Sequence, residues 1–192
     1  NVRAHGVPVV VAVNAFKDDS AEELNWVCER ALAAGASAAA VSTHWSDGGR
    51  GAEELARAVV KVAAQGTQFN HLYEVTLPIK KKIETIATTI YGAAGVSFSP
   101  QAERDVELAT RLGFDRLPIC MAKTPLSLSH DPTVKGRPSG FTVPIQELRI
   151  LAGAGFLTAV CSGIQLMPGL PKKPAGERID VDPQSGQIVG LQ

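Results

Sequence analysis

The feature that most constrains the fold is a continuous apolar run, Val7–Val13, made mostly of β-branched residues. Such a run is typical of a strand that is covered on both faces in a parallel sheet. Ser20 and Glu23 then have the spacing of a capping box, and apolar residues recur at helical intervals up to Gly35. A second apolar run follows at Ala38–Val41. The sequence therefore predicts a strand, a helix and a parallel strand joined by a right-handed crossover.

The same alternation continues along the chain. The patterns predict helices over Glu53–Ala64, Leu77–Ile90 and Ser99–Leu112, the last with Ser99 as its N-cap. Leu117–Met121 is a third apolar run and predicts another strand. The fold class that we expect is α/β, with a mostly parallel sheet and flanking helices.

The last third of the chain is expected to be less regular. Thr124–Gly140 is rich in Ser, Pro, Gly and charge, and predicts a long loop of a length that is usually functional or mobile. An apolar strand around Phe156–Val160 and a rigid turn at Met167–Pro171 follow. Ile179–Asp182 and Gln187–Leu191 flank a Pro-Gln-Ser-Gly turn, so we expect a terminal hairpin.

Charge and composition exclude several classes of protein. Nineteen basic and nineteen acidic residues give a formal net charge of zero, which provides no overall field for a nucleic acid or an anionic membrane. No apolar run is long enough to cross a bilayer. Cys28, Cys120 and Cys161 are odd in number, distant and apolar in context, so we expect reduced thiols in the cytosol or the mitochondrial matrix. The start at Asn1 suggests a chain cut from something longer.

The histidines show no metal-ligand spacing with one another or with cysteine; they are His5, His44, His71 and His130. We therefore expect no transition-metal site. Ser127, His130 and Asp131 contain the side chains of a catalytic triad, but they are adjacent in one loop. The favoured interpretation is local, with Ser129 or Asp131 bonding the backbone at a turn before Pro132.

Two predicted strands end in an aromatic residue beside a polar one. Asn14 and Phe16 follow the first strand, and Ser42 and Trp45 follow the second. Ligands bind beyond the carboxyl ends of parallel strands, so the two rings could clamp a flat heterocycle while Asn14 and Ser42 supply hydrogen bonds. The alternative is that both rings cap the end of the core. Trp26, by contrast, lies on a helix and is expected to be packing or interface surface with no route to that crevice.

Anion binding has weaker support. No P-loop of the form G-x-x-x-x-G-K-[ST] is present. Gly48 and Gly49 precede a helix, so their amides could hold an anion, although a glycine-rich turn is commonly only a turn. Lys123, Lys135 and Arg137 follow the third strand, where they suit a phosphate or a glutamate tail, or are simply solvated loop charges.

A long series of motifs resembles the formate–tetrahydrofolate ligase family. The series comprises Val9–Asn14 with Phe16, His44–Trp45 with Gly48–Gly49, Ile90–Ala93, Leu117–Thr124, Ser127–Pro132, Lys135–Pro138, Gly153–Phe156 and Met167–Pro171. It spans essentially the whole chain in the right order and resembles the carboxy-terminal part of that family's chain. Pro125, Leu126 and Ser162–Leu166 depart from the family's pattern.

The resemblance implies a fold related to P-loop NTPases. It also implies a reaction in which ATP and formate give formyl phosphate, which then formylates N10 of tetrahydrofolate. The implied cofactors are ATP with Mg²⁺ and tetrahydrofolate, with a monovalent cation as a further option. Phe16 and Trp45 match the family's pair of folate-ring clamp residues. The family's phosphate-binding lysine and formyl-phosphate arginine belong to an amino-terminal P-loop domain, so the catalytic residues are expected there.

On this basis we expect an α/β folate-clamp region over residues 1–115 and a carboxy-terminal region of the ligase over residues 116–192. The first hypothesis is a portion of an enzyme that is inactive alone and needs the amino-terminal domain as its partner. The alternative is a non-catalytic folate-binding or oligomerisation module without ATP chemistry. Either form is expected to be a homo-oligomer, cytoplasmic or in the mitochondrial matrix.

Overall fold

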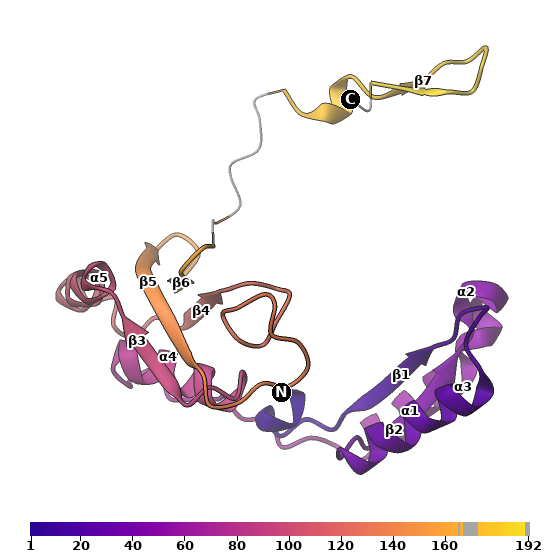
Figure 1. Ribbon diagram of the computed structural model, residues 1–192, viewed down its shortest axis with the longest axis horizontal. Coiled ribbons are helices and arrows are strands. Elements are labelled where there is room, and N and C mark those ends of the chain that lie inside the picture. Colours follow the sequence, from indigo (N-terminus) through magenta and orange to yellow (C-terminus); the bar gives the residue numbers. More distant parts are fainter. Residues whose placement is uncertain (165, 167–172, 191–192) are drawn as a thin grey trace.

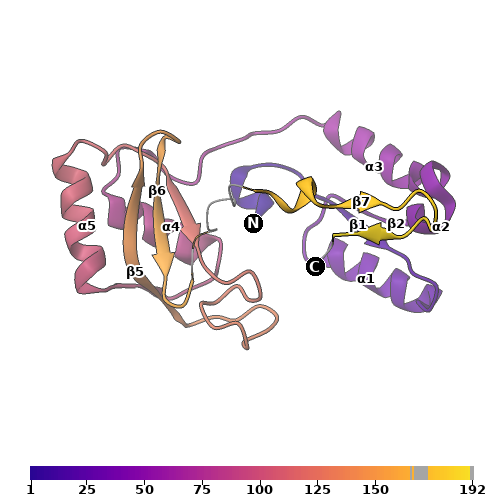
Figure 2. The same cartoon turned by 90° about the horizontal axis from the view of Figure 1, so that it is seen from above.

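A computed structural model describes residues 1–164, 166 and 173–190 of the chain. Figures 1 and 2 show a first body that carries β1, β2 and α1 to α3 and a second body that carries α4, α5 and β3 to β6, and Figure 1 shows the terminal segment with β7 apart from both. None of the helices within these described residues is long and apolar enough to cross a membrane.

The first body is built on a two-stranded parallel sheet. β1 (Val10–Asn14) pairs in register with β2 (Ala38–Ser42). The crossover between them is α1 (Ala21–Ala33), and α3 (Glu53–Ala63) also packs on the sheet. Ser20 caps α1 with the predicted capping box, in which its hydroxyl accepts from Glu23 N and the Glu23 carboxylate accepts from Ser20 N. The predicted strand, helix and parallel strand are therefore confirmed.

The expectation that the first strand is covered on both faces is wrong for the described chain. Val13 is buried, but Ala12 is exposed and the remaining apolar residues of β1 are half-buried. Within the described residues each strand of this two-stranded sheet has one edge without a strand partner, and β1 has only one buried residue. The helices themselves expose apolar side chains, namely Trp26, Val27, Leu32, Val59 and Val60.

Short helical turns lie after β2 and at the beginning of the chain. α2 (His44–Asp47) leads into the 3-10 turn η2 (Gly48–Ala52) and from there into α3. The other such turn, η1 (Val2–His5), lies before β1. α2 therefore carries Trp45 almost directly after the end of β2.

The second body contains a four-stranded mixed sheet of order β3-β5-β6-β4. Its strands are β3 (Gly95–Phe98), β4 (Ile119–Ala122), β5 (Thr142–Leu151) and β6 (Phe156–Cys161). β3 is parallel to β5 and β4 to β6, but the central pair β5 and β6 is antiparallel. The sheet is therefore mixed rather than mostly parallel, because β6 returns directly after β5 through a short connection.

The apolar core of this body lies between the sheet and two helices, α4 (Ile79–Thr89) and α5 (Pro100–Arg111). A bulge between Ile145 and Glu147 adds one residue to β5. Because of this extra residue, Ile145 and Leu148 both reach the core although three positions separate them.

A buried lysine fastens α4 to two other segments. The Lys82 ammonium donates hydrogen bonds to the carbonyl oxygens of Val75 at 3.2 Å, Asp115 at 2.6 Å and Leu117 at 2.7 Å. Desolvation lowers the pKa of Lys82, and the nearby Asp115 carboxylate opposes this shift. The three carbonyl partners offset the cost of burying the charge and fix the approach to β4.

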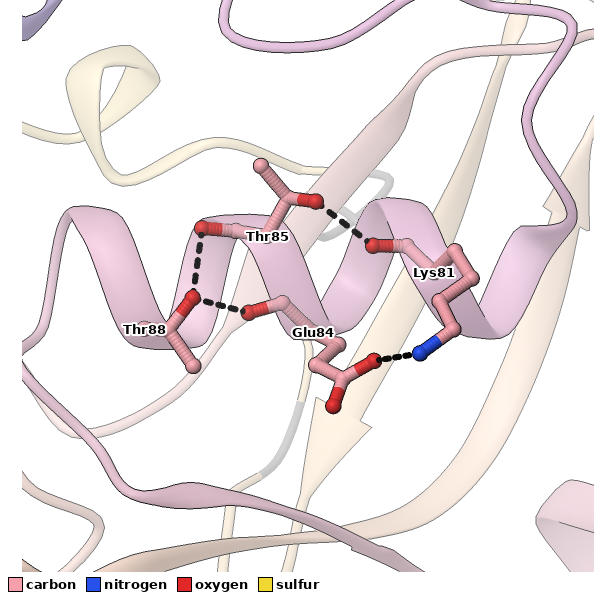
Figure 3. Close-up of polar contacts among 4 residues, drawn as sticks. All are labelled: Lys81, Glu84, Thr85 and Thr88. Atoms are coloured by element: carbon pink, nitrogen blue, oxygen red, sulfur yellow. Dashed lines mark hydrogen bonds and ion pairs between the residues drawn. The ribbon is translucent and has the colours of Figure 1, made fainter.

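The opposite face of α4 is held by local contacts (Figure 3). Lys81 pairs with the Glu84 carboxylate at 2.7 Å. The Thr85 hydroxyl donates to the Lys81 carbonyl and the Thr88 hydroxyl to the Glu84 carbonyl, at 2.8 and 2.9 Å. These threonines hydrogen-bond within the helix, so their polar groups need no tertiary partner.

The three predicted helices are confirmed, with Pro78 as the N-cap of α4 rather than in its first turn. The terminal hairpin is confirmed by the antiparallel pair β7 (Asp180–Val181) and β8 (Ile188–Val189). The predicted turn at 167–171 lies outside the described residues. Because β3 pairs with β5, the second body spans residue 115, and the two bodies divide the chain before α4, earlier than the expected regions 1–115 and 116–192 do.

Candidate functional site

The structure brings the predicted strand-end residues to one edge of the first sheet. Asn14 and Ser42 are register partners at the last position of β1 and β2. The next amide, Ala15 N, donates to the Ser42 carbonyl at 2.9 Å. Phe16 and Trp45 therefore leave from the ends of two hydrogen-bonded strands.

Both rings are open to solvent. Phe16 is 57% exposed and Trp45 is 74% exposed. The alternative in which the two rings cap the core does not describe this structure, because a core cap is removed from water. Two exposed aromatic side chains at adjacent strand ends are available for stacking on a ligand.

Ser42 has a different role from the one predicted. Its side chain is 1% exposed. Its hydroxyl lies 3.0 Å from His44 Nδ1 and 3.4 Å from the Gly51 carbonyl. A hydroxyl buried between two internal partners positions the turn that carries Trp45, and it does not face solvent as Asn14 does.

The Trp45 turn is closed by contacts around Thr43. Thr43 N donates to the Gly51 carbonyl at 3.0 Å, and its hydroxyl donates to the Asp47 carboxylate at 2.7 Å. Gly51 packs so closely that an added Cβ would lie 2.5 Å from the Thr43 carbonyl carbon. The glycine-rich stretch thus has a packing reason at Gly51, which the sequence pattern did not distinguish from its neighbours.

The Phe16 turn is closed by Asp19. Phe16 N donates to Asp19 Oδ2 at 2.8 Å, and Asp19 N donates back to the Phe16 carbonyl at 3.2 Å. This reciprocal pair lies directly before the Ser20 cap of α1. The sequence signal, an Asp three residues after the aromatic residue and next to an N-cap, was present but not used.

Two hollows flank the strand ends. One, of about 520 Å³, is lined by Val13, Asn14, Asp19, Glu22, Glu23, Leu24, Trp26 and Val27. The other, of about 510 Å³, is lined by Thr43, Ser46, Asp47, Arg50 and Gly51. Both volumes lie within the range of small-molecule sites.

The expectation for Trp26 therefore needs correction. Trp26 is 56% exposed and lines the same hollow as Asn14. The Arg30 guanidinium lies over its ring at 5.2 Å. Trp26 lies near the strand ends because α1 packs on β1 and the first two turns of α1 line the same hollow as Asn14.

The predicted cations of the long loop are largely occupied by the loop itself. Lys123 donates to the carbonyls of Thr124 and Ser127, and its ammonium lies 4.9 Å from the centre of the Tyr91 ring. Desolvation lowers the pKa of Lys123, while nearby Cys161 opposes the shift. Lys135 donates to two further loop carbonyls at 2.6 and 3.2 Å.

The candidate anion residues do not form one group. Gly48 and Gly49 lie on the first body, whereas Lys123 and Arg137 lie on the second. Gly48 N already donates to the His44 carbonyl, and its φ of 60° with ψ of −142° is a glycine conformation. The alternatives of a simple turn and of loop charges fit Gly48 and Lys123 better.

The local interpretation of the Ser-His-Asp stretch is confirmed. The Ser129 hydroxyl donates to the Asp131 carbonyl at 3.1 Å, and Asp131 Oδ1 accepts from Thr133 N at 2.8 Å. Hydrogen bonds from the Thr133 hydroxyl and amide lower the pKa of Asp131. His130 Nδ1 has no hydrogen-bond partner within the described residues.

The thiols differ in burial. Cys161 is buried, and burial raises its pKa to about 11 although Lys123 opposes the shift. Cys28 is half-buried, and Cys120 is exposed on β4 although its sequence context is apolar. Within residues 1–164, 166 and 173–190, no cluster of three potential metal ligands is found.

The fold and this edge define an α/β protein in which two adjacent strand ends carry exposed aromatic residues. The chain belongs to the formate–tetrahydrofolate ligase family, whose profile, described as "Formate--tetrahydrofolate ligase", matches residues 1–192. The family expected from the sequence motifs is therefore confirmed.

Proteins similar to this chain have tetrahydrofolate in their names. The cytoplasmic C-1-tetrahydrofolate synthase of Schizosaccharomyces pombe is 50% identical over 192 residues, 100% of this chain and 20% of that protein. The formate–tetrahydrofolate ligase of Saccharopolyspora erythraea is 50% identical over 191 residues, 100% of this chain and 34% of that protein. The mitochondrial monofunctional C1-tetrahydrofolate synthase of Mus musculus is 49% identical over 186 residues, 97% of this chain and 19% of that protein. The chain thus spans about a fifth to a third of these relatives.

Proposed function

We propose that this chain supplies the folate-ring clamp of an ATP-dependent ligase that joins formate to tetrahydrofolate. The observation that carries the proposal is the pair of exposed rings, Phe16 and Trp45, at the ends of two register-paired strands. An exposed aromatic residue gains little from folding, so two of them at one sheet edge are better explained by a ligand than by packing.

In the proposed complex the pterin lies between the two rings. Stacking contributes about 0.5–1.5 kcal/mol per aromatic pair beyond the area that is buried. Asn14 is exposed beside the rings and lines the adjoining hollow, so its amide is the proposed source of directed hydrogen bonds. Ser42 positions the residues next to both rings. Its carbonyl accepts from the amide that precedes Phe16, and its hydroxyl bonds the histidine that precedes Trp45.

The remaining chemistry belongs to the whole enzyme. ATP with Mg²⁺ and formate would give formyl phosphate at residues of an amino-terminal P-loop domain, and the chain alone would be inactive. The placement of this chain in the carboxy-terminal part rests on the order of its motifs alone, and aligning it with a complete relative tests it. A monovalent cation and a homo-oligomeric state are further proposals, as is location in the cytoplasm or mitochondrial matrix, the compartments named for relatives.

One observation favours the alternative of a non-catalytic binding or oligomerisation module. α1 and α3 expose Leu32, Val59 and Val60, which an interface would cover. The two proposals differ in whether the complete gene product releases ADP in the presence of formate and tetrahydrofolate. ADP release favours the ligase, and folate binding without it favours the module.

Titration of tetrahydrofolate against Phe16→Ala and Trp45→Ala tests the clamp. Each change should weaken binding by about 1–3 kcal/mol, as truncation of an aromatic hot spot does. Phe69→Ala is the matched control, because Phe69 is 59% exposed but lies beside His5 and His71, away from the strand ends. Unchanged binding by both clamp variants would refute the proposal.

A further inference from the structure

The polar hollow beside Trp45 contains a cationic side chain, that of Arg50. Arg50 lines this hollow of about 510 Å³ together with Thr43, Ser46, Asp47 and Gly51. Within the described residues, the Arg50 guanidinium makes no ion pair and no side-chain hydrogen bond.

The other polar side chains of the hollow are already engaged with one another. The Thr43 hydroxyl donates to Asp47 Oδ2 at 2.7 Å, and the Ser46 hydroxyl donates to the Thr43 carbonyl at 3.1 Å. Arg50 is therefore the lining residue whose donors are available to a ligand. A guanidinium presents its N–H groups in a planar fork that matches the two oxygens of a carboxylate.

The hollow is lined in part by the helix that carries Trp45. Ser46 and Asp47 belong to α2, the same short helix that carries Trp45. A ligand stacked on Trp45 and extended at one end could therefore place its far group in the hollow. Tetrahydrofolate has this form, since its pterin continues through an aminobenzoyl group to a glutamate with free carboxylates.

We propose that Arg50 forms a carboxylate-binding subsite for the glutamate tail of the folate. This inference rests on the proposed clamp function. The proposal places the tail at Arg50 and not at Lys123 or Lys135, whose ammonium groups donate hydrogen bonds to loop carbonyls. Asp47 lines the same hollow, so its negative charge opposes the tail and limits the affinity of the subsite.

The test compares two ligands on the complete gene product under anaerobic conditions: tetrahydrofolate, and 6-methyltetrahydropterin, which has the ring and lacks the tail. Arg50→Gln should weaken the binding of tetrahydrofolate about 5- to 10-fold and leave the binding of 6-methyltetrahydropterin unchanged. A loss of this size is expected for an exposed charge-assisted contact. Asp47→Asn should act in the opposite direction and tighten tetrahydrofolate. Arg50→Lys keeps the charge and should fall between the parent and Arg50→Gln.

Lys17→Gln is the matched control, because it removes the same charge next to Phe16. An equal loss in Lys17→Gln would indicate a general field and overturn the subsite. Equal effects of Arg50→Gln on both ligands, or none on either, would also overturn it. Failure of the clamp proposal would give a different result, because Trp45→Ala would then bind 6-methyltetrahydropterin as tightly as the parent protein does.

Discussion

The Ser42 hydroxyl lies 3.0 Å from Nδ1 of His44, the residue that precedes Trp45. Because the Ser42 carbonyl also accepts from Ala15 N, the residue before Phe16, one buried serine is bonded beside both proposed clamp residues. The spacing of the two rings is thus set by the backbone between them, and both rings are exposed to solvent.

Ser42→Ala should therefore affect binding more than stability. The change removes the contact to His44 and should lower the free energy of unfolding by about 1 kcal/mol, the net worth of a typical hydrogen bond. Tetrahydrofolate binding should also weaken, because the Trp45 turn loses its anchor. Urea denaturation and ligand titration measure the two effects; parent-like binding would contradict this role for Ser42.

Asp19→Ala should loosen the Phe16 turn. Loss of the 2.8 Å bond from Phe16 N should weaken tetrahydrofolate binding about 2- to 5-fold, equivalent to about 0.5–1 kcal/mol. Asp19→Asn keeps an acceptor oxygen at this position and should restore most of the affinity. If the Asn variant is as weak as the Ala variant, the carboxylate charge matters and the turn does not.

Gly51→Ala should destabilise the protein, whereas Gly49→Ala should not. The new Cβ at Gly51 would lie 2.5 Å from the Thr43 carbonyl carbon, and relieving such overpacking costs about 1–3 kcal/mol. An added Cβ at Gly49 meets no atom within 4 Å. Thermal melting of the two variants side by side checks the contrast, and equal melting temperatures would argue against it.

Lys82→Met should lower the free energy of unfolding by about 2–4 kcal/mol, since it keeps the aliphatic stem but leaves three carbonyls without their donor. Lys81→Met is the matched control on the same helix, because Lys81 is exposed and pairs with Glu84 (Figure 3). The control should change stability by less than about 0.5 kcal/mol. Similar losses in both variants would show that Lys82 acts through helix propensity alone.

Iodoacetamide at pH 8 should modify Cys120 quickly and spare Cys161 in the folded protein. Cys120 is exposed, whereas Cys161 is buried with a pKa raised to about 11, so its reactive thiolate is scarce. Because the folded pKa is above the usual 9.0, the stability contributed by the neutral thiol is complete below pH 9 and is lost as the pH rises through 11. Mass spectrometry of the alkylated peptides checks the order of reaction; early labelling of Cys161 would contradict it.

The elements with strong local signals were predictable. The capping box at Ser20 and the Ser99-Pro100 start each place a helix, because caps act within a single turn. β3 and β5 were not predicted, since Gly95, Ser97 and the charged residues of β5 break the apolar pattern. Their pairing is set by partners distant in sequence, which no local pattern encodes.

The candidate site was predictable in outline only. Phe16 and Trp45 could be placed because strand ends follow from apolar runs. The engagement of Lys123 by loop carbonyls depends on how the loops close, and so does the lack of a partner for Arg50 among the residues that the structure describes. In the sequence both residues are simply cations in loops. Only the hydrogen-bond geometry of the folded chain distinguishes the engaged Lys123 from Arg50.

The extra residue in β5 also bears on which length changes the family can accept. If Gln146 were paired regularly and did not form the bulge, Leu148 would turn to the outer face and Arg149 would face the core, because successive side chains alternate across a strand. A deletion at Gln146 would remove the bulge and keep Leu148 in the core, whereas a deletion elsewhere in β5 would move the residues beyond it to the opposite face. The turn after Leu151 has no such constraint, so natural insertions and deletions should accumulate at 152–155 and be missing from 143–150 except at Gln146.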